Sequence, residues 1–174
     1  MNKFPLLSAV QHNDLAQLQD LVAKSSNEDA NAFAKDAYRA GIMAVNDQNV
    51  EGLSILLPIL LPGQVNDLFC LCVELQDTTL VHLLLPYADP TYEDSSALQL
   101  ASALGNTYLF DLLYPLSNPK KALRAMQKTA RPGRTDQWKM LKERIDTVAL
   151  QKKLERAAKP AQTNAPKMSQ GRKL

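Results

Sequence analysis

Residues 50–58 (VEGLSILLP), 78–86 (TTLVHLLLP) and 107–115 (TYLFDLLYP) are three versions of one pattern, an apolar run that ends in proline. In each version a second proline follows four residues later, which gives the pairs Pro58 and Pro62, Pro86 and Pro90, and Pro115 and Pro119. Successive pairs are separated by 28 and 29 residues. A fixed period of this kind is typical of a tandem repeat protein.

The segments in front of these runs also align with one another. They are AGIMAVNDQN (40–49), LFCLCVELQD (68–77) and ALQLASALGN (97–106). A fourth copy, PLLSAVQHND (5–14), lies 35 residues before the next one and lacks both prolines. We expect its connection to the second unit, residues 23–38, to be seven residues longer than the others. The sequence therefore predicts four tandem units within residues 1–118.

Each unit has the pattern of two short helices. In the second unit Ile42 and Val45 share one face of a helix, NDQN turns the chain, and residues 50–57 are almost continuously apolar. A helix that is apolar on most sides must be covered on most sides. Proline ends such a helix because it has no N–H to donate and its ring clashes with the preceding turn. Strict alternation is absent, so strands are not favoured, and units that cannot bury their own apolar faces must stack as an all-α solenoid.

Residues 86–118 carry a more specific pattern. Ala88-Asp89-Pro90, Ser96-Ala97-Leu98-Gln99-Leu100-Ala101, Gly105-Asn106 and the apolar run 109–113 follow one another in the order of an ankyrin repeat. The segment resembles the ankyrin repeat family, and the compact units with paired prolines resemble divergent bacterial or phage ankyrin-like proteins. The resemblance is weaker over residues 40–85 and weakest over 1–39. It implies an ankyrin-like α-solenoid of four helix-pair repeats, with a generic helical-repeat fold as the alternative.

The chain departs from the ankyrin pattern in ways that bear on its fold. Ser96 stands at the family's threonine position and Gln99 at its histidine position. The period of 28–29 residues is shorter than the usual length of about 33. The family resemblance implies that the missing residues come from the connection that forms β-hairpin fingers, so we expect little β-structure.

Charge divides the chain into two parts. The whole sequence has a net charge of only +2, but residues 1–118 carry −10 and residues 119–174 carry +12. Residues 119–131 form an amphipathic pattern in which all basic side chains fall in one arc at about 100° per residue. We expect helices over 119–131 and 135–158 that cap the last repeat, with Trp138, Leu141, Ile145 and Val148 facing it. Residues 159–174 contain no acidic residue, and we expect them to form a flexible basic tail.

Acidic and tyrosine side chains suggest one binding surface on the repeats. The candidates are Asp67, Glu74, Asp77, Tyr87, Asp89, Tyr92, Glu93, Asp94 and Gln99. The simpler interpretation is helix capping and solubility, because acidic groups favour helix N-termini. The functional interpretation is a surface for a basic protein partner, since exposed tyrosines are frequent at interfaces. The ankyrin resemblance implies a non-enzymatic scaffold, such as an effector or regulator that engages a cytosolic protein.

Basic side chains suggest an alternative partner, a nucleic acid. The candidates are Lys120, Lys121, Arg124, Lys128, Arg131 and Arg134. Such a row would give salt-sensitive binding to phosphates, although aromatic residues for base stacking are missing around it. A solvated helix face, neutralisation of the acidic repeats and a targeting role for the tail are the other interpretations. The apolar side of residues 119–131 is mostly alanine, which is weak for membrane insertion.

No motif in the sequence predicts catalysis, a metal site or a cofactor. The two histidines, His12 and His82, lie in different units without a ligand set around them. Cys70 and Cys72 would point about 200° apart on a helix, so we expect reduced core residues. The longest apolar stretch, GLSILLPILLPG, is interrupted by proline and shorter than the ~20 residues of a spanning helix. We therefore expect a cytoplasmic protein, or a secreted effector acting in a host cytosol, and leave its oligomeric state open.

Overall fold

The computed structural model describes residues 4–24, 30–129 and 135–158. Over these ranges the chain forms helices and no strand, which confirms the predicted all-α class. The α-helices are α1 (Pro5–Gln11), α2 (Leu15–Ala23), α3 (Ala30–Asn46), α4 (Val50–Leu56), α5 (Pro62–Glu74), α6 (Thr78–Leu84), α7 (Tyr92–Leu104), α8 (Thr107–Leu113), α9 (Pro119–Thr129) and α10 (Lys139–Ala158). Short 3-10 helices are η2 (Leu57–Ile59), η3 (Tyr114–Leu116) and η4 (Thr135–Trp138).

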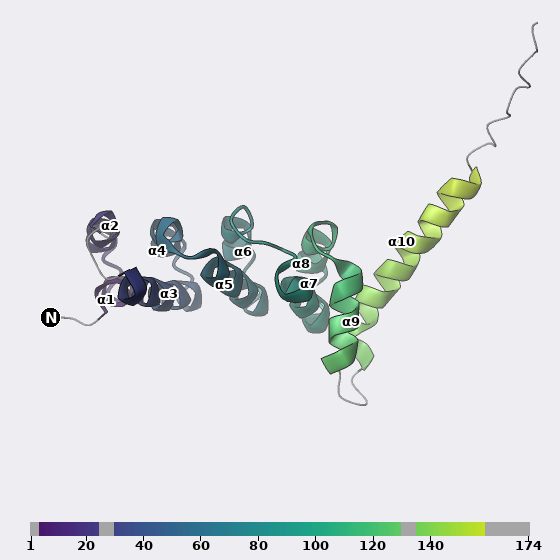
Figure 1. Ribbon diagram of the computed structural model, residues 1–174, viewed down its shortest axis with the longest axis horizontal. Helices are drawn as coiled ribbons and strands as arrows, with labels where there is room; N and C mark the ends of the chain where they lie inside the picture. Colours follow the sequence, from purple (N-terminus) through teal and green to yellow (C-terminus); the bar gives the residue numbers. More distant parts are fainter. Residues whose placement is uncertain (1–3, 25–29, 130–134, 159–174) are drawn as a thin grey trace, which may run out of the picture.

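The first eight α-helices are arranged as four pairs in two rows. Helices α1, α3, α5 and α7 lie in one row, and their partners α2, α4, α6 and α8 lie in the other (Figure 1). Each helix of the first row packs against the next one, and α9 continues that row after α7. We call this arrangement the helix array.

The turn inside every pair has the same geometry. A residue with a left-handed backbone comes first, at Asn13, Gln48, Gln76 and Gly105, with φ between 52° and 69°. The next residue caps the second helix: Asp14, Asn49, Asp77 and Asn106 each accept a hydrogen bond of 2.8–3.0 Å from the backbone N–H three residues later. Such caps satisfy backbone donors that a helix start leaves free.

Prolines mark the boundaries between pairs. Pro58 and Pro115 lie in the 3-10 turns that follow α4 and α8, whereas Pro62 and Pro119 are the first residues of α5 and α9. The first position of a helix suits proline because its missing N–H has no partner there in any case. These two proline pairs therefore end one unit and begin the next, whereas Pro86 and Pro90 both lie in the connection between α6 and α7.

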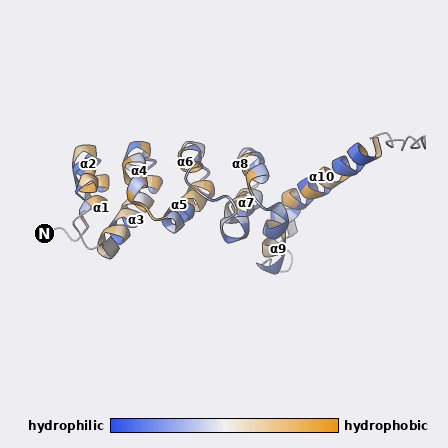
Figure 2. Ribbon diagram, turned by 45° about the horizontal axis from the view of Figure 1, so that its top comes forward, coloured by the Kyte–Doolittle hydropathy of each residue, from blue (hydrophilic) through white to orange (hydrophobic). Residues whose placement is uncertain are grey.

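The core runs along the array between the two rows, where hydrophobic ribbon segments face each other (Figure 2). Equivalent positions are occupied by similar side chains. Ala9, Ala44, Cys72 and Ala101 are fully buried on the first-row helices. On the second-row helices the equivalent buried residues are Leu18, Leu53, Val81 and Phe110. Small residues on one helix and large ones on its partner allow the two to approach closely.

The predicted long connection at residues 23–38 is wrong, because α3 already begins at Ala30. The stretch ANAFAKDAY is rich in alanine, the strongest helix former. Packing explains the rest: the buried Asp36 carboxylate accepts hydrogen bonds from the backbone N–H groups of Leu6 at 2.8 Å and Leu7 at 3.4 Å. Asp36 therefore caps α1 from α3, an interaction that requires these residues to be helical.

The C-terminal helices cover the end of the array. In α9, Ala122 and Met126 are buried. The helix expected over residues 135–158 is instead a 3-10 turn followed by α10, whose Leu141 is fully buried. Arg144 of α10 forms an ion pair with Asp111 of α8, which holds the start of α10 against the array. Beyond that contact α10 runs away from the array (Figure 1), as the exposure of Leu150 and Leu154 there also indicates.

Candidate binding cleft

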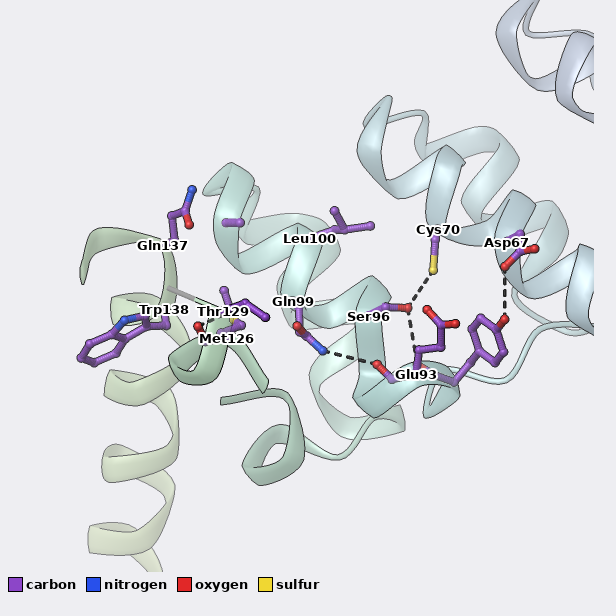
Figure 3. A pocket seen from close by; sticks show the side chains of 12 residues that line it. Asp67, Cys70, Glu93, Ser96, Gln99, Leu100, Met126, Thr129, Gln137 and Trp138 are labelled. Carbon is purple, nitrogen blue, oxygen red and sulfur yellow. Dashed lines mark hydrogen bonds between the residues drawn. The ribbon is translucent and has the colours of Figure 1, made fainter. Parts of the chain in front are cut away.

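The candidate site is a cleft of about 460 Å³ on the first-row side of the array. Its walls come from α5, α7, α9 and η4, which lie up to 71 positions apart in the sequence. Figure 3 shows the lining side chains around this space. We call it the cleft, and its lining residues are Asp67, Cys70, Tyr92, Glu93, Ser96, Gln99, Leu100, Ala103, Met126, Thr129, Gln137 and Trp138.

The acidic side of the cleft is organised around the Asp67 carboxylate. Its two oxygens accept hydrogen bonds from the hydroxyls of Tyr92 at 3.3 Å and Tyr38 at 3.4 Å. The charge of Asp67 is the main cause that raises the pKa of Tyr92, and it adds to the effect of burial in raising the pKa of Tyr38. Asp67 is thus oriented from both sides and remains exposed to solvent.

The rim residue Glu93 belongs to an unusual left-handed turn at the start of α7. Glu93, Asp94 and Ser95 have φ values of 46°, 57° and 65°, a conformation that costs a residue with a side chain about 1–2 kcal/mol. The Gln99 amide donates to the Asp94 carbonyl at 3.0 Å, and the buried Ser95 hydroxyl accepts from the Asn118 N–H at 2.9 Å. These contacts hold the turn in place and with it the position of Glu93.

The wall between α5 and α7 contains a thiol. The sulfur of Cys70 lies 3.0 Å from the Ser96 hydroxyl oxygen (Figure 3). Burial raises the pKa of Cys70, which keeps it in the thiol form that is a poor nucleophile. Burial also raises the pKa of the neighbouring Cys72 to about 12. Both cysteines are free thiols, but the prediction of core residues is confirmed only for the buried Cys72, because Cys70 is half-buried and lines the cleft.

The opposite side of the cleft is apolar. Leu100, Met126 and the half-buried Trp138 face it from three different elements. A hydrogen bond of 3.0 Å from the Ser102 hydroxyl to the Gln137 carbonyl attaches η4 to α7. The equivalent residues in the first three units are Val10, Val45 and Val73. The fourth unit has serine at this position instead of valine, and this change is the sequence signal for the attachment of η4 to α7.

The structure brings only part of the predicted acidic surface into the cleft. Asp67, Tyr92, Glu93 and Gln99 line it, whereas Asp94, the residue next to Glu93, is not among the lining residues. Sequence reasoning missed Cys70, Ser96, Leu100, Ala103, Met126, Thr129, Gln137 and Trp138 as lining residues. Half of these, Met126, Thr129, Gln137 and Trp138, depend on how α9 and η4 dock, for which Ser102 is the one signal in the sequence.

The other predicted residues of the acidic surface lie outside the cleft. Glu74 ends α5, and Asp77 caps α6. Tyr87 is 63% exposed between α6 and α7. The Asp89 carboxylate accepts two hydrogen bonds from Thr91, at 2.8 Å and 2.7 Å, which lower the pKa of Asp89. Asp77 and Asp89 therefore have local structural roles.

The predicted basic side chains lie on a different surface. Those of Lys120, Lys121, Arg124 and Lys128 are exposed along α9, while Arg131 and Arg134 lie outside the described residues. Lys120 also lines a second hollow of about 450 Å³ together with Lys152 and the apolar Ile145 and Val148 of α10. The basic surface thus continues from α9 onto α10.

Among residues 4–24, 30–129 and 135–158, no cluster of three or more His, Cys, Asp or Glu side chains could hold a metal ion. His82 instead lies 2.7 Å from the Tyr108 hydroxyl. No helix in the described part of the chain has the length and hydropathy to span a membrane.

Comparison with known proteins found no match, so the function has to be argued from the structure. The chain matches no protein-family model, no curated protein and no solved structure. The resemblance to ankyrin repeats therefore stays a prediction from the sequence.

Proposed function

We propose that this protein is a non-enzymatic interaction module, an ankyrin-like α-solenoid that binds a basic segment of a cytosolic protein in the cleft. The observation that carries this proposal is the composition of the cleft: two carboxylates, Asp67 and Glu93, stand opposite an apolar side, and no basic side chain lines it among the residues that the structure describes. A lysine or arginine fits such a site because its charged end can meet a carboxylate while its aliphatic stem covers apolar surface.

Long-range electrostatics support the same class of partner. Residues 1–118 carry a net charge of −10, so a basic partner is attracted before contact is made. Each exposed ion pair contributes only about 0.2–1 kcal/mol. Most of the affinity would then come from apolar contact with the half-buried Leu100 and Trp138, and the charges would set specificity and the rate of association.

The test compares two double variants with the same change in net charge. Asp67→Asn with Glu93→Gln neutralises the cleft, and Asp47→Asn with Glu51→Gln neutralises two exposed acids in the second unit. Partners are recovered from nuclease-treated cytosol and quantified by mass spectrometry. We expect the cleft variant to lose a basic partner about tenfold at low salt, while the control retains it. Equal recovery by both variants would contradict the proposal.

A second candidate function, binding of a nucleic acid, is favoured by the exposed row on α9. Lys120, Lys121, Arg124 and Lys128 can contact phosphates at the same time. Four such contacts predict a slope of about −3.6 for log K against log salt on duplex DNA. Replacing all four by glutamine should abolish retention on DNA or RNA at about 50 mM salt. An intact protein that shows no retention under this condition eliminates this candidate.

A further inference from the structure

The C-terminal segment of this chain is basic, and a basic segment is the kind of ligand that we propose for the cleft. Residues 159–174 contain Lys159, Lys167, Arg172 and Lys173 and no acidic residue. The cleft presents Asp67 and Glu93, and its lining within the described part of the chain contains no basic side chain. The segment and the site are thus complementary in charge, and both belong to one chain.

The length of the chain allows the segment to reach the cleft. Trp138, which lines the cleft, directly precedes α10. The 20 residues of α10 span about 30 Å. From Ala158, an extended chain covers about 3.3–3.6 Å per residue, so Arg172 and Lys173 reach about 46–54 Å. This distance exceeds the length of α10 by about 16–24 Å, and this remainder is the length available to pass from Trp138 across the cleft to Asp67 and Glu93.

We propose that residues 159–174 bind in the cleft of the same chain, with Arg172 and Lys173 at Asp67 and Glu93, and so compete with the partner. This inference rests on the proposed function of the cleft, because it assumes that the cleft accepts basic segments. It adds regulation: the free cleft is exposed only when the segment is displaced, by a partner of higher affinity or by an anionic surface that attracts the segment.

The expected strength of this competition follows from tethering. A short flexible connection gives an effective concentration of about 1 mM at the second site. If the segment alone binds with a Kd of about 0.1 mM, the tethered segment weakens a competing ligand about tenfold. Competition of this size is measurable and still allows a partner of micromolar affinity to bind.

The first experiment uses full-length variants and a defined probe. Lys167→Gln, Arg172→Gln and Lys173→Gln together remove three of the four positive charges of the segment, whereas Lys152→Gln, Lys153→Gln and Arg156→Gln remove the same charge from exposed positions on α10. The probe is a fluorescent synthetic peptide of residues 159–174, whose binding is followed by anisotropy at about 50 mM salt. We expect the segment variant to bind the probe about tenfold more tightly than the wild type, and the α10 variant to match the wild type.

The second readout is the fluorescence of Trp138, the only tryptophan of the chain, at the cleft itself. We expect weaker quenching by acrylamide in the wild type than in the segment variant, and equal quenching at about 1 M salt, where charges are screened. Protection that disappears on dilution by about a hundredfold would show that a second copy donates the segment, which overturns the same-chain proposal.

The outcomes also separate this inference from the proposed function. If the wild type and the segment variant bind the probe equally and show equal quenching, the regulation by residues 159–174 is wrong while the cleft still binds basic segments. If neutralising Asp67 and Glu93 in the segment variant leaves probe binding unchanged, the cleft is not the binding site, and both proposals fail.

Discussion

The side-chain amide of Asn49 donates a hydrogen bond of 3.0 Å to the side-chain oxygen of Asn13, 36 residues earlier in the chain. The same relationship recurs between Asn106 and Gln76, also at 3.0 Å. In both cases the cap of a second-row helix binds the left-handed residue of the preceding turn. The intermediate cap is Asp77, a carboxylate, which has no amide hydrogen to donate to the turn before it.

Asn49 should therefore contribute to stability in two separable ways. Replacing Asn49 by alanine removes the cap and the bond to Asn13, and we expect a loss of about 1–2 kcal/mol in the free energy of unfolding. Asn49→Asp retains a capping oxygen and should lose less. Urea titrations followed by circular dichroism measure both values, with the exposed Asp47→Ala expected to stay within about 0.5 kcal/mol of the wild type. Equal losses for the alanine and aspartate variants would contradict the two-part account.

Two glycines should respond to alanine in opposite directions. A Cβ at Gly105 or Gly63 would meet nothing within 4 Å, so contact with other atoms plays no part. Gly105 has a φ of 69°, and alanine there should lower the free energy of unfolding by about 1 kcal/mol. Gly63 lies in the first turn of α5, where alanine should raise it by about 0.5–1 kcal/mol. Thermal and urea unfolding of both variants check this prediction, and a shift in the same direction would refute it.

Cys72 should make the protein less stable in alkali. Its folded pKa is raised to about 12, so the folded state keeps a proton that the unfolded state releases above its ordinary value of 9.0. The free energy of unfolding then falls as pH rises from about 9 to 12, by up to about 1.4 kcal/mol per pH unit.

Cys72→Ala removes this thiol and places in the third unit the residue found at the equivalent positions Ala9, Ala44 and Ala101. We expect this variant to lose less stability than the wild type between pH 8 and about 10 in urea titrations. Parallel pH profiles for the two proteins would show that Cys72 does not titrate differently in the folded state.

Ser102 should control how η4 attaches to the array. Ser102→Val introduces the residue of the first three units and removes the hydrogen bond to the Gln137 carbonyl. We expect unchanged helical content, a loss of about 1 kcal/mol in stability and a red shift of Trp138 emission, because η4 is no longer held. Ser102→Thr keeps the hydroxyl and should restore the emission. An unchanged emission maximum in the valine variant would count against this role.

Local signals in the sequence predict most of the helices. The apolar runs and the prolines place α4, α6 and α8 because both act within a few residues of the chain. The start of α3 at Ala30 was missed because it depends on packing of Asp36 against α1. The left-handed turn at Glu93, Asp94 and Ser95 carries little local signal, since none of these residues is glycine and only Asp94 is of a type that adopts this conformation occasionally.

The candidate site is less predictable than the fold. Asp67, Tyr92, Glu93 and Gln99 were grouped by charge and residue type, and they do share the cleft. Trp138 lines the cleft only because η4 docks against the array. The hydrophobic periodicity within one helix does not show which other helices it will contact. Only Ser102, at a position otherwise occupied by valine, marks that contact in the sequence.

The side-chain hydrogen bonds between neighbouring units join residues only 23–36 positions apart. Chains with such local contacts fold rapidly, and their early parts can fold while synthesis continues. The first units can therefore be complete on the ribosome before the last helices emerge. The cleft needs α5, α7, α9 and η4 together, so it can form only after residue 138 has left the exit tunnel.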